Sequence, residues 1–120
     1  MRELLFKGYS TEKKVLFTGL PMHSIVVEYS REQIKSMHIF EWTNVMDWRG
    51  INIYRGDKVQ MFSKGEKTLM GYVEYERHLC RYIVRGEKTY DDLSHTGMTW
   101  SEEGITLDGI EIIGNIIHDL

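Results

Sequence analysis

The chain has 120 residues, of which 42% are hydrophobic and 28% are charged, and its formal net charge is −3. This length and composition are those of one globular domain, and they exclude a disordered polar tail and a pair of full domains. The longest apolar runs have three residues, whereas a membrane-spanning helix needs about 18. With one cysteine and no stretch typical of a secretion signal, the sequence predicts a cytoplasmic protein that needs no disulfides.

The charges are unevenly distributed along the chain. Residues 1–60 carry nine basic and seven acidic side chains, whereas residues 61–120 carry six and eleven. Beyond Lys88 every charged residue is acidic. This balance disfavours duplex binding, which relies on clustered basic side chains to neutralise phosphates. The acidic end is either a solvated surface that aids solubility or a surface for a basic partner.

Eleven glycines and one proline divide the whole chain into short apolar segments, and this pattern favours β structure with frequent turns. In the first half we expect strands over 4–6, 14–17 and 24–29. The third of these carries three β-branched residues in a row. Ser30 and Gln33 have the spacing of a capping box, which predicts one short helix after Ser30. Residues 37–42 fit either the continuation of this helix or a strand, because their polarity also alternates.

The second half has a clearer alternation of polar and apolar residues. We expect strands over 57–62, 69–76, 79–85, 105–107 and 110–117. Residues 63–68 are polar and are predicted to form a turn. Residues 86–104 are acidic and weakly patterned, so we expect a long loop there.

The one concentration of basic side chains lies at the hairpin formed by 69–76 and 79–85. It consists of Arg77, Arg81, Arg85 and Lys88. Strand alternation places Glu74 and Glu76 across from Arg77 or Arg81, where opposite charges stabilise a sheet by about 0.2 to 1 kcal/mol per pair. These basic residues are therefore either structural partners on an exposed sheet face or candidate nucleic-acid-binding residues, with nearby tyrosines as stacking surfaces.

Several segments, taken in order, resemble the YopX family of small phage and prophage proteins. They are 1–8, 50–59, 71–75, 80–82 and 111–116. The central segment has a glycine followed by an Ile-Tyr pair, one further residue, a Gly-Asp pair and then a β-branched residue. The resemblance implies a phage or prophage origin and a mainly β fold, and it implies no reaction.

Four residues are predicted to be structural turn residues: Gly56, Asp57, Gly114 and Asn115. Gly56 can take a backbone conformation closed to other residues, and Asp57 can accept a hydrogen bond from a nearby amide as the turn enters a strand. In small barrels such a turn, the following hairpin and a closing strand make an SH3-like arrangement.

We therefore predict a β-rich α+β fold in a single domain, 1–120. Its C-terminal subregion, 50–120, is expected to form a small, partly open SH3-like barrel. Its N-terminal subregion, 1–49, is expected to be β structure with the one short helix. The boundary between them falls near Thr43–Asn44 and Arg49–Gly50.

The sequence offers little support for catalysis. His78 and Cys80 lie two residues apart on a predicted strand, but two ligands do not make a zinc site, and burial in an apolar strand raises the pKa of a thiol. Ser94 and His95 follow two aspartates, yet neighbours in a polar loop do not supply the geometry of a triad. We predict no enzyme, no cofactor and no metal. The remaining enzyme alternative is a small hydrolase or metal enzyme centred on His78, Cys80, Asp91 and His95.

The aromatic residues are the stronger functional signal, because Trp and Tyr are favoured interface anchors. Trp48 stands between two charged residues and Trp100 lies in the acidic stretch, so we expect both to be partly exposed. The candidate partner-binding residues are Trp48, Trp100, Asp91, Asp92, Glu102 and Glu103.

These features together predict a phage or prophage accessory protein that binds a host or phage protein. Its sharper form is an inhibitor of a host function, including antiviral defence. A nucleic-acid-binding module is the first alternative and the small enzyme the second. Edge strands and apolar residues also favour self-association.

Overall fold

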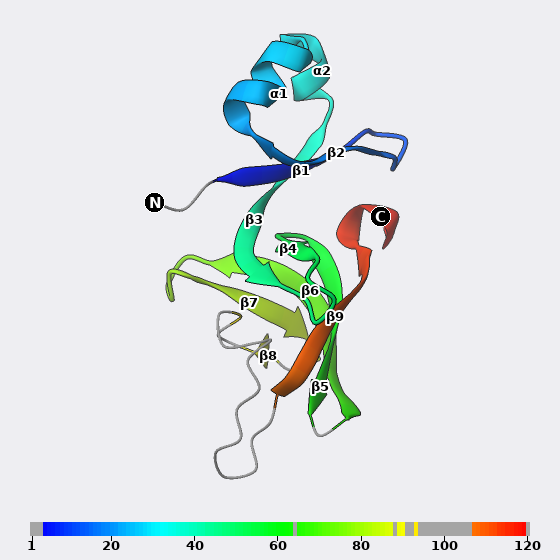
Figure 1. Ribbon diagram of the computed structural model, residues 1–120, viewed down its shortest axis with the longest axis vertical. Helices are drawn as coiled ribbons and strands as arrows, with labels where there is room; N and C mark the ends of the chain where they lie inside the picture. Colours follow the sequence, from blue (N-terminus) through cyan, green and yellow to red (C-terminus); the bar gives the residue numbers. More distant parts are fainter. Residues whose placement is uncertain (1–3, 64, 88, 91–92, 94–106, 120) are drawn as a thin grey trace.

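The computed structural model describes residues 4–63, 65–87, 89–90, 93 and 107–119. These residues form two antiparallel sheets in an elongated molecule, and the second sheet lies at the end away from the two α-helices (Figure 1). The first sheet has the strand order β2-β1-β3-β4 and the second has the order β8-β7-β6-β5-β9. The mainly β class and the open, barrel-like arrangement are thus confirmed. No helix in the described part of the chain has the length and apolar character needed to cross a membrane.

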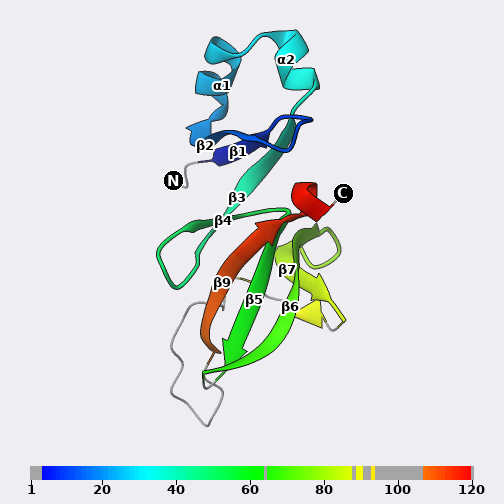
Figure 2. The same ribbon diagram turned by 90° about the vertical axis from the view of Figure 1, so that its right-hand side faces the viewer.

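The elements follow one another in a simple order along the chain. They are β1 (Leu5–Tyr9), β2 (Val15–Pro21), α1 (Met22–Glu28), α2 (Arg31–Lys35), β3 (His38–Met46), β4 (Asn52–Tyr54), β5 (Asp57–Ser63), β6 (Glu66–Glu76), β7 (Arg81–Gly86), β8 (Thr89–Tyr90), β9 (Leu107–Asn115) and the 3-10 helix η2 (Ile116–Asp119). Figure 2 shows β9, β5 and β6 side by side as a curved layer, with the two α-helices at the opposite end of the molecule.

The N-terminal subregion contains two short helices, so the prediction of one helix is wrong. The expected strand over 24–29 is instead the end of α1, which begins directly after Pro21. A helix buries Ile25 completely and leaves Val27 in solvent, whereas a strand would place both on one face. Burial of Ile25 therefore overrides the β propensity of this run.

The helix predicted after Ser30 is confirmed as α2. The Ser30 amide donates to Gln33 Oε1 over 2.7 Å, and the Gln33 amide donates to Ser30 Oγ over 3.1 Å, which completes the capping box. The helix has only five residues, and the strand β3 begins at His38. The alternation in residues 37–42 therefore reflected a strand.

The strands predicted in the second half are present, but several of their bounds differ. The turn is shorter than 63–68, because β6 begins at Glu66. Residues 77–80 form a turn and not the start of a strand, so β7 begins at Arg81. The last two predicted strands are one strand, β9, which ends at Asn115, and the predicted strand residues 116 and 117 belong to η2. In the predicted loop over 86–104, Gly86 ends β7 and Thr89–Tyr90 form β8. Residues 105 and 106 and most of the rest of that loop lie outside the described residues.

Strand β3 joins the two subregions. It pairs with β1 through residues 38–41 and with β4 through Trp42, Val45 and Met46. The register shifts between Trp42 and Val45, where Asn44 has a φ of 68°. Thr43 Oγ1 stabilises this bulge, because it donates to the Ile53 carbonyl over 2.7 Å and accepts from the Val45 amide over 3.2 Å.

Two hydrophobic clusters are formed by the described residues. The larger is enclosed by the second sheet and contains Ile53, Val59, Met61, Val73, Val84, Leu93 and Ile110. The smaller contains Tyr9, Phe40 and Tyr54 of the first sheet together with Ile117 of η2. It therefore packs the 3-10 helix that follows β9 against the first sheet.

A buried carboxylate lies beside the smaller cluster. Asp57 Oδ1 accepts from Lys7 Nζ over 2.9 Å and from Asn115 Nδ2 over 3.0 Å, and Oδ2 accepts from the Tyr54 amide over 2.8 Å. Burial lowers the pKa of the Lys7 ammonium, but the Asp57 carboxylate outweighs this effect and the pKa is raised, so Lys7 is charged. The sequence predicted that Asp57 would accept a hydrogen bond from a nearby backbone amide, and the Tyr54 amide is this donor.

The other predicted turn residues differ from one another. Gly56 has a φ of 87°, and its amide and carbonyl bond to Val73 and Ile116, both over 2.8 Å. Asn115 ends β9, and its side chain accepts from the Ile117 amide over 2.9 Å. Gly114 does not lie in a turn, because it is a strand residue opposite Lys58.

Replacing Asp57 tests how strongly this carboxylate holds the sheets together. We expect Asp57→Asn to lower the free energy of unfolding by about 3 kcal/mol, since it leaves the buried Lys7 ammonium without its counter-charge. Urea denaturation followed by circular dichroism measures the loss. The control is Glu74→Gln, which removes an exposed ion pair with Arg85 and should change stability far less. Equal losses in the two variants would contradict the role given to Asp57.

Candidate functional site

The loop between β3 and β4 is folded around one buried carboxylate. Asp47 Oδ1 accepts from the amides of Arg49 over 2.9 Å and Ile51 over 3.0 Å. Asp47 Oδ2 accepts from the Arg49 guanidinium, at 2.9 Å to Nη2 and 3.1 Å to Nε. The backbone closes the same loop, because the Gly50 amide donates to the Asp47 carbonyl over 2.9 Å and Gly50 has a φ of 81°. Asp47 therefore fixes the shape of residues 47–51.

The same loop covers the outer edge of β9. The Ile112 amide donates to Asp47 Oδ2 over 3.3 Å, and Arg49 Nη2 donates to the Ile112 carbonyl over 3.0 Å. The Trp48 amide donates to the Ile110 carbonyl over 3.0 Å. These bonds satisfy backbone groups of a strand that has β5 on its other side. The loop is thus attached to the second sheet at three points.

This fixed loop holds three large apolar side chains in solvent. Trp48 is 63% exposed, Met46 49% and Ile51 47%. Large apolar groups gathered on a rigid support are typical of a protein-binding surface. We call residues 46–51 the Asp47 loop.

A groove of about 310 Å³ opens beside the indole of Trp48. It is lined by Trp48, Phe62, Gly65, Gly109 and Glu111, and we call it the Trp48 groove. Trp48 Nε1 donates to Glu111 Oε1 over 3.2 Å, which orients the ring. The Trp48 Cβ lies close to Gly109, because a Cβ added to this glycine would be only 3.3 Å from it. Phe62 faces Gly109 across the β5–β9 pair, so the groove is built on the sheet itself.

The hydrogen bonds around Asp47 also set its acidity. Burial raises the pKa of this carboxyl, but the bonds from the Ile51, Ile112 and Arg49 amides and from the Arg49 side chain outweigh burial. The pKa is therefore below its usual range, and Asp47 is ionised at neutral pH.

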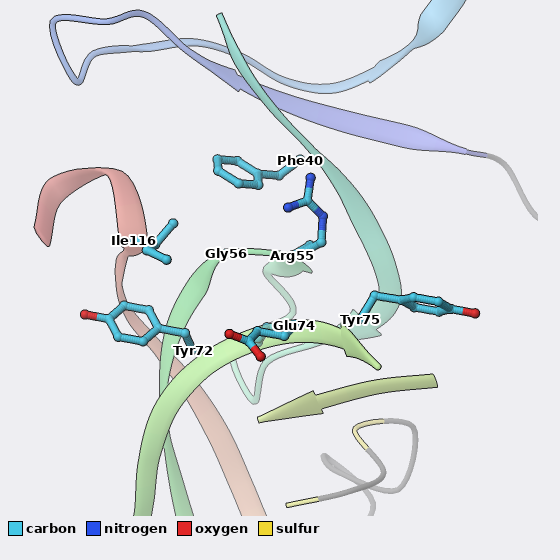
Figure 3. A pocket seen from close by; sticks show the side chains of 8 residues that line it. Phe40, Arg55, Gly56, Tyr72, Glu74, Tyr75 and Ile116 are labelled. Atoms are coloured by element: carbon cyan, nitrogen blue, oxygen red, sulfur yellow. The ribbon is translucent and has the colours of Figure 1, made fainter. Parts of the chain in front are cut away.

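A second cavity, of about 300 Å³, lies at the junction of the two sheets (Figure 3). Arg55 crosses it, stacked 4.9 Å over the Phe40 ring, and bonds to Glu41 over 2.7 Å and to the Ile39 carbonyl over 3.1 Å. Glu41 also accepts from the Tyr82 hydroxyl over 3.0 Å. Burial and the charge of Glu41 raise the pKa of Tyr82, so its hydroxyl stays protonated as a donor.

Two further polar side chains that line this junction cavity also bond within the protein. Tyr72 donates to Asp119, and Glu74 accepts from Arg85 Nε over 2.5 Å. The cavity is therefore held by internal bonds from both sheets, which is how a structural joint is built. The Trp48 groove, in contrast, presents an exposed ring and is the stronger candidate for binding another molecule.

The described candidate basic residues lie on two neighbouring elements, a turn and a strand. Arg77 lies in the turn before β7, whereas Arg81 and Arg85 lie on β7. Arg81 is opposite Glu76 in the register, as the sequence predicted for this pair. Glu74 instead pairs with Arg85, which also contacts Glu76 over 3.4 Å. Lys88 lies outside the described residues.

Among the candidate partner-binding residues, Trp48 is exposed as predicted. Trp100, Asp91, Asp92, Glu102 and Glu103 lie outside the described residues.

The residues of the enzyme alternative are placed differently from the prediction. Cys80 is exposed in the turn that follows His78 and has a φ of 52°, so the prediction of a buried strand thiol is wrong. Its Sγ donates to the Arg77 carbonyl over 3.3 Å. Asp91 and His95 lie outside the described residues. Within the part of the chain that the structure describes, no three His, Cys, Asp or Glu side chains are grouped so as to hold a metal ion.

Sequence reasoning missed Asp47 and Glu111, which shape the candidate site. A local signal existed for Asp47, because an aspartate three residues before a glycine is typical of a type I turn, and Asp47 and Gly50 have this spacing. No local signal indicated that Glu111 would meet Trp48, since 63 positions separate them.

The chain matches no protein-family model and no curated protein.

The acidity of Asp47 gives a testable pH dependence. A carboxyl whose pKa is lower in the folded state stabilises the fold fully above its unfolded pKa of about 3.9, and this stabilisation is lost as the pH falls through the folded pKa. We therefore expect the stability difference between the wild type and Asp47→Asn to shrink from about pH 5 downward. Urea titrations at a series of pH values, followed by tryptophan fluorescence, measure this difference. A difference that stays constant with pH would show that the carboxylate charge does not stabilise the loop.

Proposed function

We propose that this protein is a non-enzymatic protein-binding module that docks its partner on the Asp47 loop and the Trp48 groove. The observation that carries the proposal is the exposed Trp48, held on a fully hydrogen-bonded loop beside a groove. Tryptophan is among the residues that contribute most to binding energy when a partner covers them. The neighbouring side chains of Met46 and Ile51 extend the apolar surface.

The rigidity of the loop supports this role. Association costs free energy when flexible side chains and loops must be ordered. Here Asp47 accepts hydrogen bonds from both Arg49 and Ile51 before any partner arrives. A partner therefore meets a surface whose backbone needs no further ordering, and more of the contact energy appears as affinity.

The charge of the region supports a basic partner. Glu111 is the one charged residue among the described residues that line the groove. Beyond Lys88 every charged residue of the sequence is acidic. Opposite charges on two partners speed their encounter and exclude wrong partners. An acidic module of this kind would compete with nucleic acid for a basic site.

The resemblance of the sequence to the YopX family supports a phage or prophage setting. In that setting the partner is a host or phage protein, and the module inhibits a host function such as antiviral defence. In the second cavity the side chains of Arg55, Tyr72 and Glu74 are bonded within the protein, so it adds no support for an enzyme.

Affinity capture from a lysate of the bacterial host tests the proposal. The tagged wild type, Trp48→Ala and Leu79→Ala are compared, all checked for folding by circular dichroism. Leu79 is an exposed apolar residue in the turn before β7 and serves as the matched control. We expect a protein that the wild type and Leu79→Ala recover equally, and that Trp48→Ala loses at least tenfold, since a central aromatic anchor contributes about 2 kcal/mol or more.

Three outcomes would contradict the proposal. No protein recovered above background removes the binding function. Equal recovery by all three forms places the interface elsewhere. Recovery that is abolished by nuclease treatment shows that nucleic acid is the ligand, as in the alternative based on the basic residues.

A further inference from the structure

We infer that the Trp48 groove recognises an arginine side chain of the partner, whose guanidinium lies on the open face of Trp48 and pairs with Glu111. This inference rests on the proposed function and names the chemistry of its site. Three features of the groove carry it: the open indole face, the adjacent carboxylate and the apolar floor.

The indole of Trp48 is open to a planar cation. Its hydrogen bond to Glu111 fixes the ring edge, and Gly109 supports its backbone end. With 63% of the residue exposed, a face of the ring stays in solvent. Tryptophan is the aromatic side chain that attracts cations most strongly, and arginine stacks on it more often than lysine.

Glu111 supplies the counter-charge at the edge of the same ring. Its Oε1 accepts the indole N–H, and among the described residues none donates to Oε2. A guanidinium on the indole face therefore finds a carboxylate oxygen beside it. Arg49, which is close along the chain, does not neutralise Glu111, because its guanidinium bonds to Asp47 and to the Ile112 carbonyl.

The rest of the groove favours one arginine with aliphatic neighbours over a polybasic run. Phe62 and the glycines 65 and 109 give an apolar lining that suits the methylene stem of an arginine. Lys67 lies opposite Phe62 in the β5–β6 register, and its charge opposes a second cation at that end. The predicted ligand is therefore an apolar segment with a single arginine.

Peptide titration of the whole chain tests the inference. The probes are acetyl-Leu-Arg-Leu-amide and the same peptide with citrulline, which keeps the shape of arginine without its charge. The readout is the indole N–H signal of Trp48 in nitrogen-15 NMR spectra, assigned by its disappearance in Trp48→Phe. We expect the arginine peptide to shift this signal saturably and the citrulline peptide to bind about tenfold more weakly.

Matched variants separate the carboxylate from general effects. Glu111→Gln keeps an acceptor for the indole N–H but removes the negative charge. It should therefore weaken binding of the arginine peptide about fivefold and leave the affinity for the citrulline peptide unchanged. Glu74→Gln alters an ion pair with Arg85 outside the Trp48 groove, and it should change the affinity for neither peptide.

Two results would overturn the arginine inference. One is equal binding of the two peptides, and the other is no shift of the Trp48 signal with the arginine peptide. If either occurs while lysate capture still depends on Trp48, the inference fails and the proposed function stands. If capture fails as well, both fail.

Discussion

The buried carboxylate of Asp57 is the constraint on which the arrangement of the two sheets depends. Asp57 begins β5, yet it binds Lys7 from β1 and Asn115 from the end of β9. Burying a carboxylate costs free energy unless hydrogen-bond donors and a counter-charge surround it. Removing one of its partners leaves the other charge buried and unpaired. The first strand, the central hairpin and the last strand must therefore meet together. The smaller hydrophobic cluster lies beside the same point, because Lys7 Nζ is 5.5 Å from the Tyr9 ring centroid and 5.1 Å from the Tyr54 ring centroid.

Asp47 repeats this device at the surface, with a different result. It gathers amides of its own loop and one amide of β9, and so turns a short connection into a fixed extension of the sheet. The polar groups of the loop form hydrogen bonds within the protein, whereas the side chains of Met46, Trp48 and Ile51 are exposed to solvent. The proposed binding surface and the bonds that fix the loop are thus formed by the same six residues. This explains how a small protein can hold a large aromatic residue in water without losing its shape.

The features that the sequence predicted correctly are those determined by neighbours along the chain. The capping box of Ser30 and Gln33 needs only three residues, and the Gly56–Asp57 turn needs the Tyr54 amide. The strand expected at 24–29 is absent because complete burial of Ile25 in α1 outweighs β propensity. The partners Lys7 and Glu111 were beyond prediction, since each meets its residue across 50 or more positions.

In the Asp47 loop, the groups that fix the backbone are different from the side chain that we propose contacts the partner. Its shape uses the side chain of Asp47, the positive φ of Gly50 and the backbone amide of residue 48, but not the side chain at position 48. That side chain is therefore free to change identity while the loop keeps its form. If residue 48 contacts the partner as proposed, one substitution there would change the ligand and leave the scaffold intact. The proposed docking site would then change its specificity without a change of fold.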